Sequence, residues 1–323
     1  MAMALFEVGA TLLGACIGSF LNVVIWRLQQ EDPAKRSVGG RSHCPHCGAL
    51  IRWFDNVPIV SWLLLRAKAR CCQKPISSRY PLVEALTAGL FLLLALQQPY
   101  GNVLVQTPDG FAIATNAAVA FGLQAVFLSV LVALSFIDFD TRLLPDVLTI
   151  PGIWLGLVAG VWPGLAGELF AEPNTPRWAS ALVASVAGFL VGGGVTWAIR
   201  SVGTAIFRKE AMGFGDVKLM AMIGAVLGWQ SALLTMFLGC LFGAVGGGLG
   251  VVLGRGNVIP FGPFLALGAV VCLFWRDAIV YVLFTAWPEW QSQNPAARWL
   301  VLGTSLVLLP LLFAVVRRAR RAG

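Results

Sequence analysis

Apolar stretches of about 20 residues recur along almost the whole chain, and this pattern constrains the fold more than any other feature. A helix of that length crosses the hydrocarbon core of a lipid bilayer. Only 12% of the 323 residues are charged, whereas soluble globular proteins carry about 25%. The sequence therefore predicts an all-α polytopic membrane protein with the lipid bilayer as a partner.

The spacing of the apolar stretches predicts eight to nine transmembrane helices. The lower number applies if the sixth and seventh stretches form one helix through Gly228. Residues 278–287 are either an interfacial amphipathic helix or an extension of the eighth helix. The first stretch lacks a basic start and a cleavage site, so we expect it to be a retained helix. The predicted helices are 4–26, 81–97, 117–137, 146–162, 179–199, 217–234, 235–253, 259–275 and 297–316.

Lys and Arg residues are concentrated in two segments, the loop 27–80 and the C-terminal tail 317–321. The loops expected on the opposite side contain only Arg177 and Arg298. Because Lys and Arg accumulate in cytoplasmic loops, we expect both basic segments in the cytoplasm and the N-terminus in the periplasm. The same clustering makes nucleic acid the weaker explanation of the net charge of +8.

Two aspartates far apart in the sequence are predicted to lie at one membrane face. Asp138 lies at the end of the third predicted helix, and Asp216 begins the sixth in the motif Gly-Phe-Gly-Asp. Counting crossings from a periplasmic N-terminus places both on the cytoplasmic side. Two neighbouring carboxyl groups share a proton, so one can activate water while the other protonates a scissile carbonyl oxygen. This arrangement predicts an aspartic peptidase.

The residues alone leave two alternatives for these acids. Asp140 is as good a candidate as its neighbour Asp138. Asp146 and Asp216 both precede apolar runs, so each could instead cap the N-terminus of a helix.

A cysteine-rich segment lies in the first basic loop. Cys44, Cys47, Cys71 and Cys72 fall within 30 residues, together with the only two histidines of the chain. The spacing is similar to that of a structural zinc site, although the second half is Cys-Cys instead of Cys-x-x-Cys. A cytoplasmic location disfavours disulfides. We expect zinc, with metal-free thiols as the alternative.

Several segments resemble the type IV prepilin peptidases, which are aspartic peptidases of the Gly-x-Gly-Asp type. The matching segments are 18–28, 44–47, 56–62, 76–84, 137–146, 213–219 and 260–264. The resemblance implies a bacterial inner-membrane enzyme that cleaves the basic leader of type IV prepilins and type II secretion pseudopilins after Gly at the cytoplasmic face. It also implies N-methylation of the new N-terminus with S-adenosylmethionine. The catalytic pair of the family falls on Asp216 and on Asp138, with Asp140 as the alternative.

The resemblance also implies a division of the chain into four parts. These are a first transmembrane helix (1–27), a cysteine-rich domain associated with methyl transfer (28–80), a transmembrane peptidase domain (81–276) and a C-terminal extension with another helix and a basic tail (277–323). The family usually has a cysteine where this chain has Ala69. Zinc would therefore use Cys44, Cys47 and Cys72 with either Cys71 or a histidine.

The residues that bind the methyl donor are not identified by any motif in the sequence. Arg79, Tyr80 and Glu84 are candidate neighbours of that site, although Glu84 could simply pair with Arg79 or another nearby Arg at the interface. Two other functions remain open. One is an intramembrane protease of the presenilin or signal-peptide-peptidase type without methyltransferase activity. The other is a non-enzymatic transporter or scaffold with a zinc knuckle.

Overall fold

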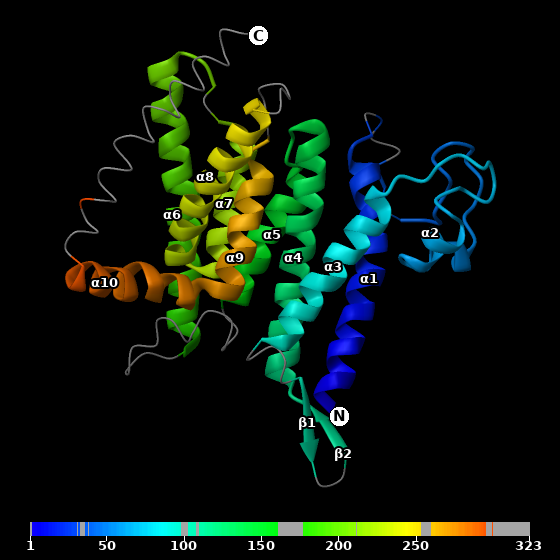
Figure 1. The fold of residues 1–323 in the computed structure, drawn as a ribbon, viewed down its shortest axis with the longest axis horizontal. Coiled ribbons are helices and arrows are strands. Elements are labelled where there is room, and N and C mark those ends of the chain that lie inside the picture. Colours follow the sequence, from blue (N-terminus) through cyan, green and yellow to red (C-terminus); the bar gives the residue numbers. More distant parts are fainter. Residues whose placement is uncertain are drawn as a thin grey trace. The chain divides into compact units, whose positions relative to one another are not determined.

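The computed structural model describes residues 2–30, 32, 36–37, 39–97, 103–107, 110–160, 177–210, 212–252, 260–294 and 299, and most of them are helical (Figure 1). The chain divides into two compact units, Met1–Leu233 and Leu234–Gly323. The first unit contains both candidate sites. Its elements are α1 (Ala2–Leu28), a 3-10 helix η2 (Trp53–Asn56), α2 (Val60–Leu64), α3 (Arg79–Leu96), β1 (Leu104–Thr107), β2 (Gly110–Ile113), α4 (Thr115–Thr141), α5 (Asp146–Ala159), α6 (Arg177–Phe207) and α7 (Phe214–Leu227).

Six of the described helices are long and apolar enough to cross a membrane. They are α1, α3, α4, α6, α8 (Trp229–Val252) and the helical run that starts with α9 (Gly262–Tyr281). The prediction of an all-α polytopic membrane protein is therefore confirmed. The total of eight to nine transmembrane helices is not confirmed. The predicted helices 146–162 and 217–234 correspond to α5 and α7, which are 14 residues long each and are not among the six, and the predicted helix at 297–316 lies outside the described residues.

The sixth and seventh predicted helices differ from the observed ones. The break lies at Gly228, where φ is +82°, and not at 234–235 as predicted. A left-handed φ costs glycine little, so the chain can leave α7 and start α8 within one residue. The expectation that one helix runs on through Gly228 is also wrong.

A short hairpin follows α3, in the connection between the predicted helices 81–97 and 117–137. β1 and β2 pair antiparallel, with Leu104 opposite Ile113 and Val105 opposite Ala112. Four-residue strands are too short to stand out between long apolar helices. The hairpin lies at the same end of α1 as the N-terminus (Figure 1).

Helices α5, α6 and α7 pack at backbone contact. A Cβ atom added to Gly188 of α6 would come within 1.9 Å of the carbonyl oxygen of Gly224 in α7. The Ser185 hydroxyl lies 3.0 Å from the Gly156 oxygen of α5 and 2.6 Å from the Ala225 oxygen of α7. Small residues and side-chain hydrogen bonds hold helices together in lipid, where apolar burial drives association only weakly. This packing fixes the position of α7, which begins with the Gly-Phe-Gly-Asp motif.

The second unit contains most of α8, then α9, a π-helical turn η4 (Val282–Ala286) and α10 (Trp287–Gln293). Trp275 has non-helical dihedral angles, φ −133° and ψ 17°, which bend α9. After this bend the chain continues as helix, and α10 runs across the direction of α9 (Figure 1). Residues 278–287 therefore extend the eighth predicted helix beyond a kink.

Candidate active site and metal centre

Asp138 and Asp216 lie close together, although 77 residues separate them in the chain. Asp138 belongs to the last turn of α4 and is 5% exposed. Asp216 belongs to the first turn of α7 and is half-buried. The two carboxyl groups are near enough for the charge of Asp138 to act on Asp216. The structure thus brings together the pair that the sequence predicted at one membrane face.

The segment between α4 and α5 packs against the Gly-Phe-Gly-Asp motif at the start of α7. A Cβ atom added to Gly215 would lie 2.9 Å from the Cβ of Leu144, so only glycine allows this approach without a shift. One turn further along, the Lys218 ammonium donates to a carboxylate oxygen of Asp146 at 2.5 Å. The ion pair ties the start of α7 to the start of α5. Sequence reasoning missed this pair, because it considered Asp146 only as a helix cap.

Asp140 is in a different environment from Asp138. It is exposed, and its carboxylate accepts hydrogen bonds from Arg79 of α3 at 2.5 Å and from Gln29 at 2.7 Å. Arg79 also donates to the Phe136 carbonyl oxygen at 3.1 Å and lies over the Phe136 ring. Asp140 therefore links α4 to α3 and to the end of α1.

Two simpler interpretations of the acidic residues are wrong. The N-cap residues of α5 and α7 are Pro145 and Gly213, so Asp146 and Asp216 lie inside the first helical turns and do not cap them. Glu84 does not pair with Arg79, which pairs with Asp140. The Glu84 carboxylate instead accepts the backbone N–H of Ile59 at 2.7 Å.

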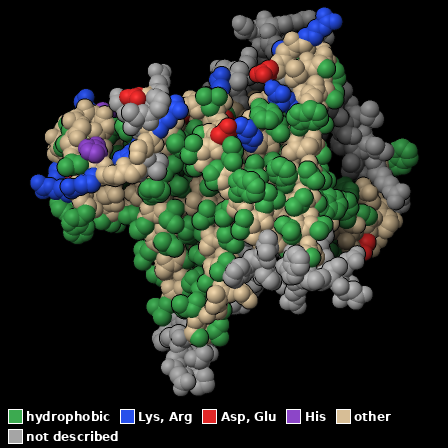
Figure 2. Space-filling view, turned by 180° about the vertical axis from the view of Figure 1, so that it is seen from behind, with side chains coloured by type: hydrophobic (Ala, Val, Ile, Leu, Met, Phe, Trp, Pro, Cys, Tyr) green, Lys and Arg blue, Asp and Glu red, His purple; other side chains and the backbone are tan. Residues whose placement is uncertain are grey.

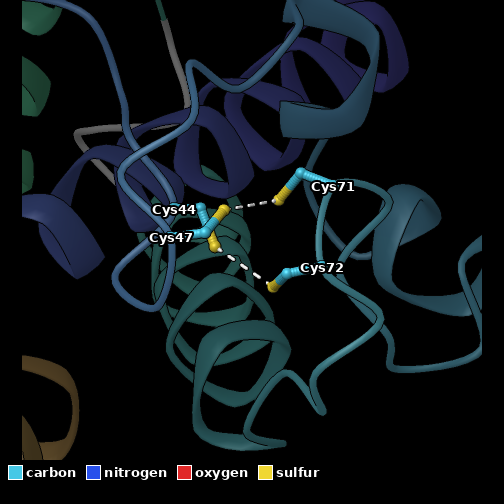
Figure 3. A group of neighbouring side chains, drawn as sticks. All are labelled: Cys44, Cys47, Cys71 and Cys72. Carbon is cyan, nitrogen blue, oxygen red and sulfur yellow. Dashed lines mark hydrogen bonds between the residues drawn. The ribbon is translucent and has the colours of Figure 1, made fainter.

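The four cysteines of the basic loop form one cluster (Figure 3). Their sulfur atoms all lie within 4.8 Å of one another, with Cys47 at 3.3 Å from Cys71 and Cys44 at 3.8 Å from Cys72. Sulfurs bound tetrahedrally to zinc at about 2.3 Å stand about 3.8 Å apart. The donor set and its spacing therefore fit a structural zinc ion. Cys71 completes the group, and neither His43 nor His46 belongs to it.

Two equivalent turns build the cluster. In the first turn Cys44 N–H donates to the Ala49 oxygen, and Gly48 N–H donates back to the Cys44 oxygen. In the second turn Ala69 N–H donates to the Lys74 oxygen, and Gln73 N–H donates back to the Ala69 oxygen. Ala69 thus occupies the position that corresponds to Cys44, and Cys72 the position that corresponds to Cys47. Cys71 supplies the fourth sulfur from an irregular place in the second turn.

Hydrogen bonding prepares one thiol of the cluster for ionisation. Burial acts to raise the pKa of Cys44, but hydrogen bonds from the backbone N–H groups of His46 and Cys47 and from neighbouring thiols outweigh it and lower that pKa to about 7. Hydrogen bonds with Cys47 and Cys44 raise the pKa of Cys71 to about 12. Thiolates are the form that binds metal, so Cys44 becomes available as a ligand at a lower pH than Cys71.

Charged side chains gather around both sites. Figure 2 shows Lys and Arg over the cysteine-rich segment and at the helix ends, while hydrophobic side chains cover the helix bodies. Such a surface is expected for helices that lie in lipid with their charged ends in water.

Comparison with known protein families identifies the chain. Residues 12–98 match the bacterial peptidase A24 N-terminal domain, and residues 125–248 match the type IV leader peptidase family. The chain belongs to the type IV leader peptidase family. Family membership supports processing of type IV prepilins. Each matched region contains one candidate site. The cysteine cluster lies in the first region, and both aspartates lie in the second.

Curated relatives match over most of their length. The prepilin leader peptidase/N-methyltransferase of Aeromonas hydrophila is 38% identical over 295 residues, which cover 83% of this chain and 90% of the relative. The protein of the same name from Stutzerimonas stutzeri is 38% identical and covers 85% and 92%. The type 4 prepilin-like proteins leader peptide-processing enzyme of Escherichia coli O78:H11 is 38% identical and covers 84% and 94%. No solved structure matches the chain significantly.

Proposed function

We propose that this chain removes the leader of type IV prepilins, and of type II secretion pseudopilins, with Asp138 and Asp216 as the catalytic pair. One observation carries this proposal. A buried aspartate near the C-terminal end of α4 and the aspartate of the Gly-Phe-Gly-Asp motif at the N-terminal end of α7 lie within electrostatic range of each other. Buried carboxyl groups that interact in this way are typical of catalytic sites. The names of the relatives support a prepilin as the substrate, and not a substrate of presenilin-type proteases.

The contacts of Asp140 favour Asp138 as the partner of Asp216. Arg79 and Gln29 hold the Asp140 carboxylate, which is thereby engaged in contacts between α4, α3 and the end of α1. Asp138 is buried and acts on Asp216 instead. A peptidase needs one carboxyl group that keeps a proton beside another that gives it up. This requirement for two neighbouring carboxyl groups supports Asp138, and not Asp140, as the partner of Asp216.

The proposed reaction uses the two carboxyl groups in complementary roles. The ionised carboxylate takes a proton from water as the water oxygen attacks the carbonyl carbon of the scissile bond. The protonated carboxyl group gives its proton to the carbonyl oxygen. When the C–N bond breaks, its electron pair stays on nitrogen, which takes up a proton, and the mature N-terminus is released as an amine.

Charge at the helix ends supports a cytoplasmic location for this site. Side-chain contacts bring these helix ends together. Asp140 joins the C-terminal ends of α1 and α4 to the N-terminal end of α3, through Gln29 and Arg79. Lys218 and Asp146 join the N-terminal ends of α7 and α5. The basic loop 27–80 leaves from this end. The positive-inside rule assigns it to the cytoplasm of a bacterial inner membrane, with the N-terminus of α1 in the periplasm.

We also propose that the chain methylates the new N-terminus and that Cys44, Cys47, Cys71 and Cys72 hold a structural zinc ion. The names of the relatives support methyl transfer. S-adenosylmethionine would supply the methyl group: the amine lone pair bonds to the methyl carbon, the C–S electron pair stays on sulfur, and the amine loses a proton. Zinc would stabilise a loop domain whose hydrophobic core is small.

Mass spectrometry of one reaction tests both activities. Purified protein in detergent is incubated with a type IV prepilin, with and without S-adenosylmethionine. We expect mature pilin without its leader in both samples, heavier by one methyl group only when the donor is present. Intact prepilin in both samples would contradict the peptidase proposal, and cleavage without a methyl group in either sample would contradict the methyltransferase proposal alone.

A further inference from the structure

A cavity of about 820 Å³ lies between the cysteine-rich segment and the ends of α1 and α3. Its volume is in the range of small-molecule binding sites, which is about 300–1,000 Å³. The described residues that line it include Cys44 and Cys71 of the metal cluster but neither Asp138 nor Asp216. The cavity is therefore separate from the peptidase pair and shares a wall with the cysteine cluster.

Glu84 of α3 forms part of the inner wall of the cavity. Its side chain is 7% exposed and its carboxylate accepts the Ile59 N–H at 2.7 Å. A carboxyl group buried among apolar side chains is costly unless a cation or hydrogen-bond donors stabilise it. Ionisable groups kept in membrane helices at this cost usually have a function. The Ile59 N–H and the Ser19 side chain both hydrogen-bond this carboxyl group, so Glu84 is held in place as the buried acidic group of the cavity wall, where it can face a cationic ligand.

The loop opposite Glu84 is held in a strained conformation. Ile59 has φ +60° and ψ −51°, and the Val60 N–H donates across it to the Pro58 oxygen, which makes a γ-turn of the rare positive-φ form. A β-branched residue adopts this conformation only where its surroundings impose it, and such positions cluster at functional sites. In this conformation the Ile59 N–H points at the Glu84 carboxylate and donates to it at 2.7 Å. The turn at Ile59 and the buried carboxylate therefore form one wall of the cavity together.

The outer wall carries the opposite charge. Arg52 and Arg70 both line the cavity, and both guanidinium groups lie within 6 Å of the Phe54 ring, at 5.8 and 5.7 Å. Arg70 makes a two-pronged ion pair with Asp55, at 2.8 and 3.0 Å. Arg52 makes no such pair with Asp55. Because guanidinium groups bind carboxylates well, Arg52 is the candidate partner for a carboxylate of a ligand.

Aromatic side chains lie between these two walls. Trp26 of α1, Trp62 of α2 and Tyr80 of α3 all line the cavity. The Trp62 indole N–H already donates to the Ile76 oxygen at 3.1 Å, which leaves its ring as the contact surface. Aromatic rings bind flat heterocycles by stacking and cations by cation–π attraction.

We propose that this cavity binds S-adenosylmethionine, with Glu84 as the counter-charge of the sulfonium and Arg52 as the partner of the ligand carboxylate. The ligand combines an aromatic base, a carboxylate and a permanent sulfonium cation, and the cavity provides a partner for each. This inference rests on the proposed methyltransferase function. It also explains why the cysteine cluster would matter for methyl transfer, because that cluster shapes one wall of the cavity.

Equilibrium binding of radiolabelled S-adenosylmethionine to the purified full chain in detergent tests the inference. We expect Glu84→Gln and Arg52→Gln each to weaken binding at least about tenfold, since each change removes the charged partner of one charged group of the ligand. The matched control is Glu210→Gln, because Glu210 is exposed, pairs with Arg200 and lies outside the cavity. The control should bind like wild type, and all three variants should cleave prepilin within about twofold of wild type, which shows that they are folded.

S-adenosylhomocysteine adds a test of the charge itself, because it lacks the methyl group and the sulfonium cation. Glu84→Gln should weaken binding of S-adenosylmethionine more than binding of S-adenosylhomocysteine, whereas Arg52→Gln should weaken both equally. If wild type binds the donor and both variants bind it equally well, the cavity is not the site, although the methyltransferase proposal stands. If wild type does not bind or transfer from the donor, the methyltransferase proposal itself fails.

Discussion

Gly215 of the Gly-Phe-Gly-Asp motif packs directly on Leu144, at a distance where any Cβ atom would lie 2.9 Å from the Leu144 Cβ. Leu144 belongs to the segment that follows Asp138, and Asp216 follows Gly215. This contact therefore sets the spacing of the two aspartates. Gly213 of the same motif is less crowded. A Cβ atom added to it would lie 3.7 Å from its nearest neighbour, a carboxylate oxygen of Asp216.

We predict that Gly215→Ala lowers the rate of prepilin cleavage at least about tenfold, because a displacement of about 1 Å at a catalytic group can cost about a hundredfold. Gly194→Ala in α6 is the matched control and should retain most of the activity, because no neighbouring atom of the described residues lies within 4 Å of a Cβ added there. Initial rates with a purified prepilin in detergent give the comparison. Equal rates for the two variants would show that the contact with Leu144 does not position the pair.

The ion pair between Arg79 and Asp140 should contribute little to stability by itself. Both side chains are about one-third exposed, at 31% and 35%, and such pairs are worth less than about 1 kcal/mol. We expect Asp140→Asn to lower the free energy of unfolding by less than about 1 kcal/mol. Arg79→Gln should cost more, because Arg79 also donates to the Phe136 carbonyl oxygen.

A double-mutant cycle measures this pair. Thermal unfolding in detergent is followed for Asp140→Asn, Arg79→Gln and the double variant. We expect the double variant to be about as stable as Arg79→Gln alone, since the amide oxygen that replaces the carboxylate at position 140 can still accept the hydrogen bond from Gln29. Fully additive losses would mean that the two side chains do not interact in the folded protein.

The equivalence of Ala69 and Cys44 leads to a prediction about zinc. Wild type should contain close to one zinc per chain, and Cys44→Ser and Cys71→Ser should each lose most of it, because structural sites need four ligands. The variant Ala69→Cys/Cys71→Ser should regain zinc, since it restores a regular Cys-x-x-Cys turn at 69–72. Metal analysis of the purified proteins gives the result.

Cys240→Ser is the control for this experiment, because Cys240 lies in α8 outside the cluster. Its zinc content should equal that of wild type. A wild-type protein without zinc would contradict the metal site, and failure of Ala69→Cys to rescue Cys71→Ser would contradict the equivalence of the two turns.

Much of this architecture could be predicted from local sequence. Each long apolar stretch within the described residues became a helix, because a segment in lipid must satisfy its own backbone hydrogen bonds. The order of helices also placed Asp138 and Asp216 at one end without any contact information. The cysteine segment was recognisable because its ligands are close in sequence.

Other features depend on contacts between distant segments and could not be predicted in this way. The choice between Asp138 and Asp140 depends on Arg79, which lies 61 residues from Asp140 and meets it only through helix packing. The break at Gly228 is invisible in hydropathy, because apolar residues flank it on both sides. The strain at Ile59 and its bond to Glu84 likewise require the folded cavity.

The central claim is that Asp138 and Asp216, and not Asp140, form the catalytic pair. Cleavage rates of a purified prepilin by Asp138→Asn, Asp140→Asn and Asp216→Asn test it most directly. We predict that Asp138→Asn and Asp216→Asn lose at least about a hundredfold in rate, as expected for loss of a general acid or base, while Asp140→Asn stays within about threefold of wild type. Full activity of Asp216→Asn, or an active Asp138→Asn beside an inactive Asp140→Asn, would contradict the claim.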